Sequence, residues 1–143
     1  MWILDAIVQW LHICSAVLII GGLFFSVYIM TPALRGSEGS DATAKSVMGR
    51  FRGVVWLGIG TLLMSGIYNL MRALAAGRFD DPVYQHTLEA KVLLALVLFS
   101  IGIGLTVPSL SFFQSRRRFL VTFNIHLGLL IVLLSTVLRR SVG

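Results

Sequence analysis

The sequence contains very little charge. Only 13% of its 143 residues are Asp, Glu, Lys or Arg, whereas 57% are hydrophobic, and the mean hydropathy is +0.89. A soluble domain of this length cannot bury so much apolar surface. The composition therefore excludes an ordinary soluble domain and indicates a membrane protein.

Other missing features each exclude a class of protein. The single cysteine, Cys14, excludes an intramolecular disulfide. Basic residues flank apolar runs instead of forming one patch, so we expect no nucleic-acid partner. The N-terminus carries Asp5 and no basic cluster, and the first apolar run is too long for a signal peptide. Acidic residues lie at predicted helix ends or in loops, so no inner carboxylate pair is available for acid–base catalysis.

What the sequence does contain is four apolar runs, at about 3–29, 54–74, 88–107 and 119–138. Each run is long enough to cross a bilayer, which takes about 20 residues. Only helices and closed barrels satisfy their backbone groups in lipid, and the runs show no strand-like alternation. We therefore predict an all-α integral membrane protein, with four transmembrane helices in an antiparallel, up-and-down bundle and a single domain covering residues 1–143.

Two local signals predict helix starts outside these runs. Asp41 can cap a helix that continues into the second run. Asp81-Pro82 is the pattern of an N-cap followed by proline at the first helical position, so the third helix should begin before the membrane. The short, arginine-rich connection before the fourth run indicates that helices three and four are antiparallel neighbours.

Basic residues predict the orientation. The first and third connections, with their borders, hold seven of them: Arg35, Lys45, Arg50, Arg52, Arg116, Arg117 and Arg118. The opposite side holds four, or five when Lys91 inside the third run is counted; the four are Arg72, Arg78, Arg139 and Arg140. By the positive-inside rule, the first and third connections face the cytoplasm and both termini lie on the outer side. The expected location is the inner (plasma) membrane of a bacterium.

Two histidines lie deep within the apolar runs. With about 1.5 Å of rise per residue, His12 lies ~14 Å from the side that carries the termini, and His126 lies ~18 Å from that side. Ionisable side chains at this depth are costly, and they mark functional sites by default. We therefore take the two imidazoles as the candidate ligands of a metal.

Each predicted helix has one face of small and polar residues. On the first helix, Asp5, Gln9 and His12 share a face because they are spaced by four and three. The corresponding faces of the other helices are, in order, Gly58, Thr61, Ser65, Asn69 and Arg72; then Lys91, Ala95, Gly102 and Thr106; then Thr122 and His126. We expect these faces to surround a polar pocket.

Neutral imidazoles on two helices at one depth are a common way to hold a heme iron or a transition metal within a bundle. Lys91 and Arg72 lie near the membrane edge, where they could pair with heme propionates or a substrate carboxylate. Simpler roles stay open: either histidine could only hydrogen-bond a neighbouring helix, and Lys91 could extend to the lipid headgroups.

Short motifs occur along nearly the whole chain: Trp10-Leu11-His12, Gly21-Gly22-Leu23-Phe24-Phe25, Thr31-Pro32-Ala33-Leu34, Arg50-Phe51-Arg52, Ser65-Gly66-Ile67-Tyr68, Glu89-Ala90-Lys91-Val92-Leu93-Leu94, and Asn124 with Gly128. Together they resemble the CopD-like (copper resistance D) membrane domain. The same superfamily includes the HemJ-type protoporphyrinogen oxidases, which are small four-helix proteins that bind heme.

The resemblance implies two functions. The HemJ-type members bind heme b and oxidise protoporphyrinogen, and they require a first-helix histidine and a third-helix lysine, which match His12 and Lys91. CopD-like members are associated with copper uptake or resistance. His126 matches neither branch, so its role rests on its depth alone.

Three functional hypotheses follow. The first is a heme b protein of electron transfer or porphyrinogen oxidation, with His12 and His126 as iron ligands, Lys91 as the catalytic or propionate-binding residue and Arg72 as a second propionate partner. The second is a copper-handling membrane protein. The third is an accessory subunit of a larger membrane complex. A redox partner or a second copy of the chain would be the expected protein partner, beside the lipid bilayer.

Overall fold

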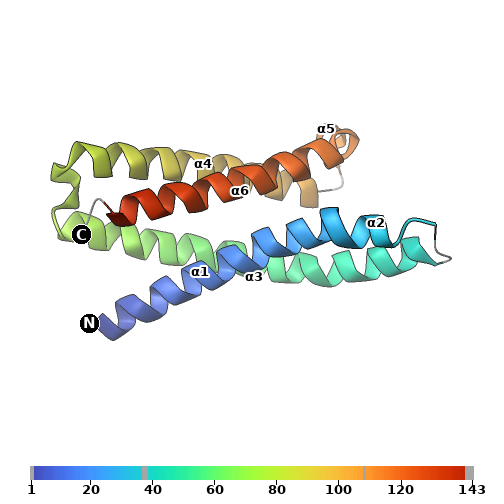
Figure 1. The fold of residues 1–143 in the computed structure, drawn as a ribbon, viewed down its shortest axis with the longest axis horizontal. Coiled ribbons are helices and arrows are strands. Elements are labelled where there is room, and N and C mark those ends of the chain that lie inside the picture. Colours follow the sequence, from blue (N-terminus) through green and yellow to red (C-terminus); the bar gives the residue numbers. More distant parts are fainter. Residues whose placement is uncertain (1, 37–38, 108, 141–143) are drawn as a thin grey trace. The chain divides into compact units, whose positions relative to one another are not determined.

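Four long helices make up most of the chain (Figure 1). The computed structural model describes residues 2–36, 39–107 and 109–140, and over these residues all of the regular structure is helical. Contacts within the chain divide it into two units, Met1–Asn69 and Leu70–Gly143. The prediction of a single domain stays a prediction.

Four helical segments are long and apolar enough to cross a membrane: Trp2–Ala33, Ser40–Ala75, Pro82–Thr106 and Arg117–Leu138. Large apolar side chains such as Leu57 and Met64 are exposed on them, as expected of helices that face lipid. The predicted fold class is confirmed: the protein is all-helical, and its four long apolar helices form two antiparallel pairs. These segments indicate an integral membrane protein.

The first unit is an antiparallel pair formed by α1 (Trp2–Phe25) and α3 (Ser40–Ala75, of which residues 70–75 belong to the second unit). Figure 1 shows α1 lying alongside α3. Position numbers fall along α3 as they rise along α1, in the pairs Asp5 with Tyr68, His12 with Ser65, Ile19 with Gly58, and Gly22 with Phe51. α3 continues through the second apolar run, as predicted, but it begins at Ser40, so Asp41 lies in the first turn and not at the predicted N-cap position.

Two glycines allow α1 and α3 to approach closely. A Cβ built on Gly58 would lie 2.8 Å from Cδ1 of Ile19, and a Cβ on Gly22 would overlap the ring of Phe51. Small residues at such positions are the usual means of close helix packing in membranes. The contact between α1 and α3 at these two positions therefore requires glycine.

The end of the first apolar run is not a regular α-helix. α1 is followed by a π-helical turn, η1 (Ser26–Met30), and by the short α2 (Thr31–Ala33). Pro32 has no N–H to donate to the carbonyl four residues earlier, so the α-helical pattern is broken there. Thr31 Oγ1 donates instead to the Ser26 carbonyl at 2.6 Å. The sequence predicted a helix only to about residue 29, and neither the π-helical turn nor α2 was predicted.

The second unit contains α4 (Pro82–Thr106) and α6 (Arg117–Arg140), which are neighbours as predicted. The N-cap prediction is confirmed, because Asp81 Oδ1 accepts a hydrogen bond from the Val83 N–H at 2.9 Å. A 3₁₀ turn, η2 (Arg78–Asp80), precedes α4. A Cβ on Gly102 of α4 would lie 3.9 Å from Nδ2 of Asn124, which places these residues at the same level of the pair.

A short helix, α5 (Ser111–Ser115), lies in the arginine-rich connection that the sequence predicted as a plain loop. The Gln114 side chain donates to the Leu105 and Val107 carbonyls at 3.4 and 3.3 Å. Carbonyls at the end of an α-helix have no partner within the helix, and the Val107 carbonyl also accepts from the Leu110 N–H at 3.3 Å. Phe113 also packs where Gly104 leaves room, since a Cβ there would be 2.5 Å from its ring. These contacts with the end of α4, seven to nine residues earlier in the chain, hold α5 in place.

Replacing Gly58 with alanine should destabilise the first unit, because the new methyl group would collide with Ile19. Overpacking of this kind costs about 1–3 kcal/mol. The matched control is Gly53→Ala on the same helix, where a Cβ meets nothing within 4 Å. Denaturant unfolding in detergent micelles should show a lower free energy of unfolding for Gly58→Ala only. Equal values for the two variants would contradict the close α1–α3 contact.

Candidate functional site

His12 is held by a hydrogen bond from α1 to α3. Its Nδ1 lies 2.8 Å from Ser65 Oγ, and Ser65 is only 6% exposed. The ring also lies against the α3 backbone, because a Cβ on Gly66 would be 3.9 Å from His12 Cε1. The imidazole is half-buried, so its position is set by the packing of the two helices.

The contacts of Ser65 are consistent with a proton on Nδ1 of His12. Ser65 Oγ donates its one proton within α3, to the Thr61 carbonyl at 2.5 Å, with the Leu62 carbonyl at 3.3 Å. A carbonyl only accepts, so the arrangement is satisfied when His12 Nδ1–H donates to Ser65 Oγ. Nε2 then carries the lone pair of the neutral ring. Fixing one ring nitrogen in this way is how proteins prepare the other for a metal.

Two further hydrogen bonds join the same faces of α1 and α3, closer to the N-terminus of α1. Tyr68 Oη donates to Asp5 Oδ1 at 2.7 Å, and Asn69 Nδ2 donates to Gln9 Oε1 at 3.2 Å. Together with the His12 contact, they show that the polar face predicted for the first helix meets the polar face predicted for the second. Polar groups that would be costly in lipid are thereby paired with one another.

His126 is in the second unit, and its ring is also held by a hydrogen bond at Nδ1. Nδ1 lies 2.8 Å from the Thr122 carbonyl, so Nδ1 must be the donor and Nε2 carries the lone pair. His126 is exposed, however, whereas Asn124, Leu127 and Gly128 are buried. His126 therefore lies on a different face of α6 from the residues that pack against α4.

Lys91 and Arg72 also belong to the second unit. Lys91 is half-buried in the first half of α4, and Arg72 is exposed in the last turn of α3. Lys91 precedes Gly102 by eleven residues, and His126 follows Asn124 by two. Because α4 and α6 are antiparallel, Lys91 and His126 differ by nine residues of rise, about 14 Å. The structure therefore does not bring Lys91 and His126 to one level of this unit.

Asn124 is a buried polar residue that sequence reasoning did not assign to the site. It is 4% exposed, and its Oδ1 has no hydrogen-bond partner among the described residues. The only sequence signal was its place in the Asn124 and Gly128 motif. An unpaired buried amide oxygen is costly, so this position is a weak point of the α4–α6 packing.

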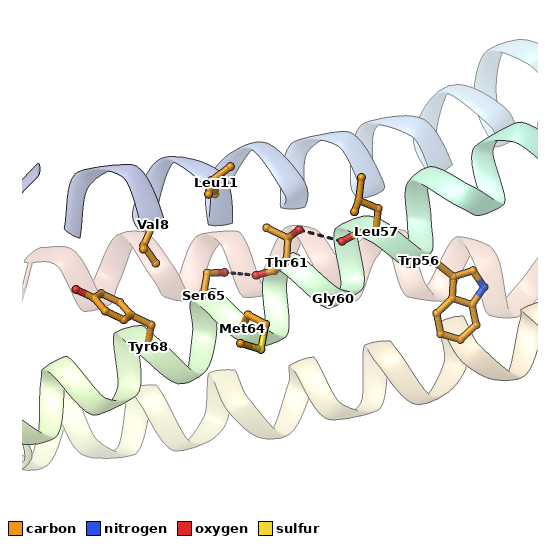
Figure 2. A pocket seen from close by; sticks show the side chains of 9 residues that line it. All are labelled: Val8, Leu11, Trp56, Leu57, Gly60, Thr61, Met64, Ser65 and Tyr68. Carbon is orange, nitrogen blue, oxygen red and sulfur yellow. Dashed lines mark hydrogen bonds between the residues drawn. The ribbon is translucent and has the colours of Figure 1, made fainter. Parts of the chain in front are cut away.

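A groove of about 600 Å³ runs along the first unit (Figure 2). Its walls come from α1 and α3 and are almost entirely apolar, the polar members being Thr61, Ser65 and Tyr68. The whole lining is Val8, Leu11, Trp56, Leu57, Gly60, Thr61, Met64, Ser65 and Tyr68. His12 is not part of it. Ser65 is thus the residue that the groove and the His12 contact share.

Over residues 2–36, 39–107 and 109–140, no three His, Cys, Asp or Glu side chains gather where they could hold a metal ion. A metal bound wholly by protein side chains usually takes three or four ligands. A heme iron takes only one or two, because the porphyrin supplies the other four. The described residues therefore offer single imidazoles and not a ligand cluster.

Comparisons with known proteins find no match. No protein-family model, curated protein or solved structure matches the chain. The resemblance based on the short motifs stays a prediction, and the case for a function rests on the contacts of His12.

The protonation of His12 can be measured directly. Nitrogen-15 chemical shifts of histidine-labelled protein in detergent at neutral pH should show the Nδ1–H form for both His12 and His126. Ser65→Ala should change the His12 shifts only, because the Ser65 hydroxyl is the acceptor that fixes its ring. Ser100→Ala, which removes a hydroxyl bonded within α4, is the matched control. His12 in the Nε2–H form in the unsubstituted protein would contradict the assignment.

Proposed function

We propose that the protein holds a b-type heme in the membrane, where His12 would be a ligand of the iron. The observation that supports this most is the His12–Ser65 hydrogen bond, which holds the imidazole against α3. Bound heme would supply one-electron redox chemistry. The corresponding role is electron transfer or the oxidation of a porphyrinogen.

The surroundings of His12 suit such a group. The ring is half-buried within a long apolar helix, and an apolar macrocycle is soluble in the same environment. Ser65 and Gly66 keep the imidazole against α3. The described residues thus provide an oriented imidazole at membrane depth, and imidazole is a ligand that heme iron takes in many proteins.

The second iron ligand in this proposal is His126, as the sequence predicted. Its Nδ1–H is bonded to the Thr122 carbonyl, so its Nε2 is likewise the nitrogen with the lone pair. Lys91 and Arg72 are proposed as cationic partners of carboxylates, either the heme propionates or those of a substrate. Lys91 is the residue proposed to act on the substrate in porphyrinogen oxidation.

Copper handling and an accessory role in a larger complex are the other two hypotheses. No contact among the described residues favours copper in particular, since the histidines and Cys14 form no cluster there. A structural accessory subunit would tolerate loss of both inner histidines, so the variants below also test that hypothesis.

His12→Ala should abolish heme binding, because it removes the proposed iron ligand without adding bulk. The matched control is His86→Ala, since His86 is exposed near the start of α4 with Glu89 at 3.5 Å. Heme content per protein, measured after purification from cells supplied with ample heme, should fall at least about tenfold for His12→Ala and stay unchanged for His86→Ala. Equal heme content in both variants would refute His12 as the ligand.

His126→Ala should leave heme bound but change its coordination. Loss of one of two imidazole ligands opens a position on the iron, which should turn a low-spin ferric spectrum into a high-spin one. Electron paramagnetic resonance of the ferric protein measures this directly. An unaltered low-spin signal in His126→Ala would show that another residue is the second ligand.

A further inference from the structure

Three consecutive arginines, Arg116, Arg117 and Arg118, are exposed where α5 is joined to α6. They lie at the end of the second unit that carries α5 (Figure 1). One segment able to cross a membrane ends at Thr106, and the next begins at Arg117. The three guanidinium groups are therefore at the boundary of two apolar segments, which is the level of the lipid headgroups in a bilayer.

No acidic side chain of the second unit can neutralise these arginines. The acidic residues of this unit are Asp80, Asp81 and Glu89, near the start of α4, and no Asp or Glu follows Glu89 in the sequence. From Glu89 to the end of α4 at Thr106, the helix rises about 26 Å. Salt screens charges over ~8 Å at physiological ionic strength. The counter-charge of the arginines must therefore come from outside this unit.

The start of α6 adds to the positive charge. α6 begins at Arg117 and has no acidic residue in its first turn. The N-terminal end of a helix carries a partial positive charge and N–H groups without a partner in the helix, so it favours anions and disfavours cations. Arg117 and Arg118 are thus placed where a helix tolerates cations least. An anion bound at this end would relieve both the helix end and the arginines.

Exposed aromatic rings adjoin the arginines on both sides. The guanidinium carbon of Arg116 lies 5.2 Å from the centre of the Phe112 ring. Phe112 and Phe119 are 58% and 68% exposed. Rings in these positions can contact lipid acyl chains while the long arginine side chains extend to the phosphates. A water-soluble phosphate would satisfy the charge but leave the rings in water, whereas an anion with an apolar tail satisfies both.

We propose that the surface formed by Arg116, Arg117 and Arg118 with Phe112 and Phe119 binds anionic phospholipid. Successive residues of a helix point about 100° apart, so the arginines contact headgroups around the end of α6 and do not form one closed pocket. The headgroup of phosphatidylglycerol has a net negative charge. That of phosphatidylcholine also carries a cation, which the arginines repel. The surface should therefore prefer phosphatidylglycerol, and this preference does not depend on heme.

Native mass spectrometry of the full chain measures this preference. Phosphatidylglycerol and phosphatidylcholine with the same acyl chains are titrated into delipidated protein in detergent. The dissociation constant of the first bound phosphatidylglycerol should be at least about tenfold lower than that of phosphatidylcholine, because each arginine near an anionic headgroup adds to binding. The ratio should fall as the salt concentration is raised.

Variants assign the preference to this surface. Replacing all three arginines with glutamine should reduce the ratio at least about fivefold, whereas replacing them with lysine keeps the charge and should keep most of the ratio. The control has the same change in net charge but removes exposed cations from other parts of the chain, Arg35→Gln, Lys45→Gln and Arg78→Gln. This control should keep the ratio within about twofold. Circular dichroism checks the fold of each variant.

Equal affinity of the unsubstituted protein for the two lipids would overturn the proposal, and this comparison needs no variant. An equal loss in the glutamine variant and in the control would also overturn it, because net charge alone would then explain the preference. Competition by glycerol phosphate at the concentration at which the lipid binds would identify a site for soluble phosphate and would contradict a lipid surface. Heme content is measured on the same preparations, so a protein that binds heme without the lipid preference, or the reverse, separates this inference from the proposed function.

Discussion

The first unit depends on one constraint: polar side chains at membrane depth must find partners within the protein. α1 and α3 meet this constraint with their Asp5–Tyr68, Gln9–Asn69 and His12–Ser65 hydrogen bonds. The last of these contacts matters most for the proposed function, because it fixes the position of the imidazole. Structure and proposed chemistry therefore depend on the same hydroxyl group.

Close packing supports this hydrogen bonding. Gly58 and Gly22 remove the side chains that would keep α1 and α3 apart, and Ile19 and Phe51 occupy the space. An apolar side chain is as stable against lipid as against another apolar helix. Membrane helices therefore associate through closely fitting surfaces and through polar contacts. The groove lies beside this contact on the same two helices, and Ser65 belongs to both.

Much of the fold follows from local patterns. Long apolar runs predicted the four helices, Asp81-Pro82 predicted the start of α4, and the spacing of Asp5, Gln9 and His12 predicted the face that meets α3. The π-helical turn, α5 and the unpaired Asn124 oxygen were not predictable, because each depends on contacts between distant residues or on how a proline is accommodated. The pairing of His12 with Ser65 depends on how far α1 and α3 are shifted along each other, which local sequence patterns do not show. The exposure of His126 depends on which face of α6 packs against α4. The depth of a residue within an apolar run does not show which face that is.

We propose that the chain holds heme through His12, whose imidazole is hydrogen-bonded to Ser65 of α3. The most direct measurement is the absorption spectrum of the unsubstituted protein, purified in detergent from cells with ample heme. The account predicts a Soret band that remains with the protein through size-exclusion chromatography. Folded protein that is colourless under these conditions would contradict it.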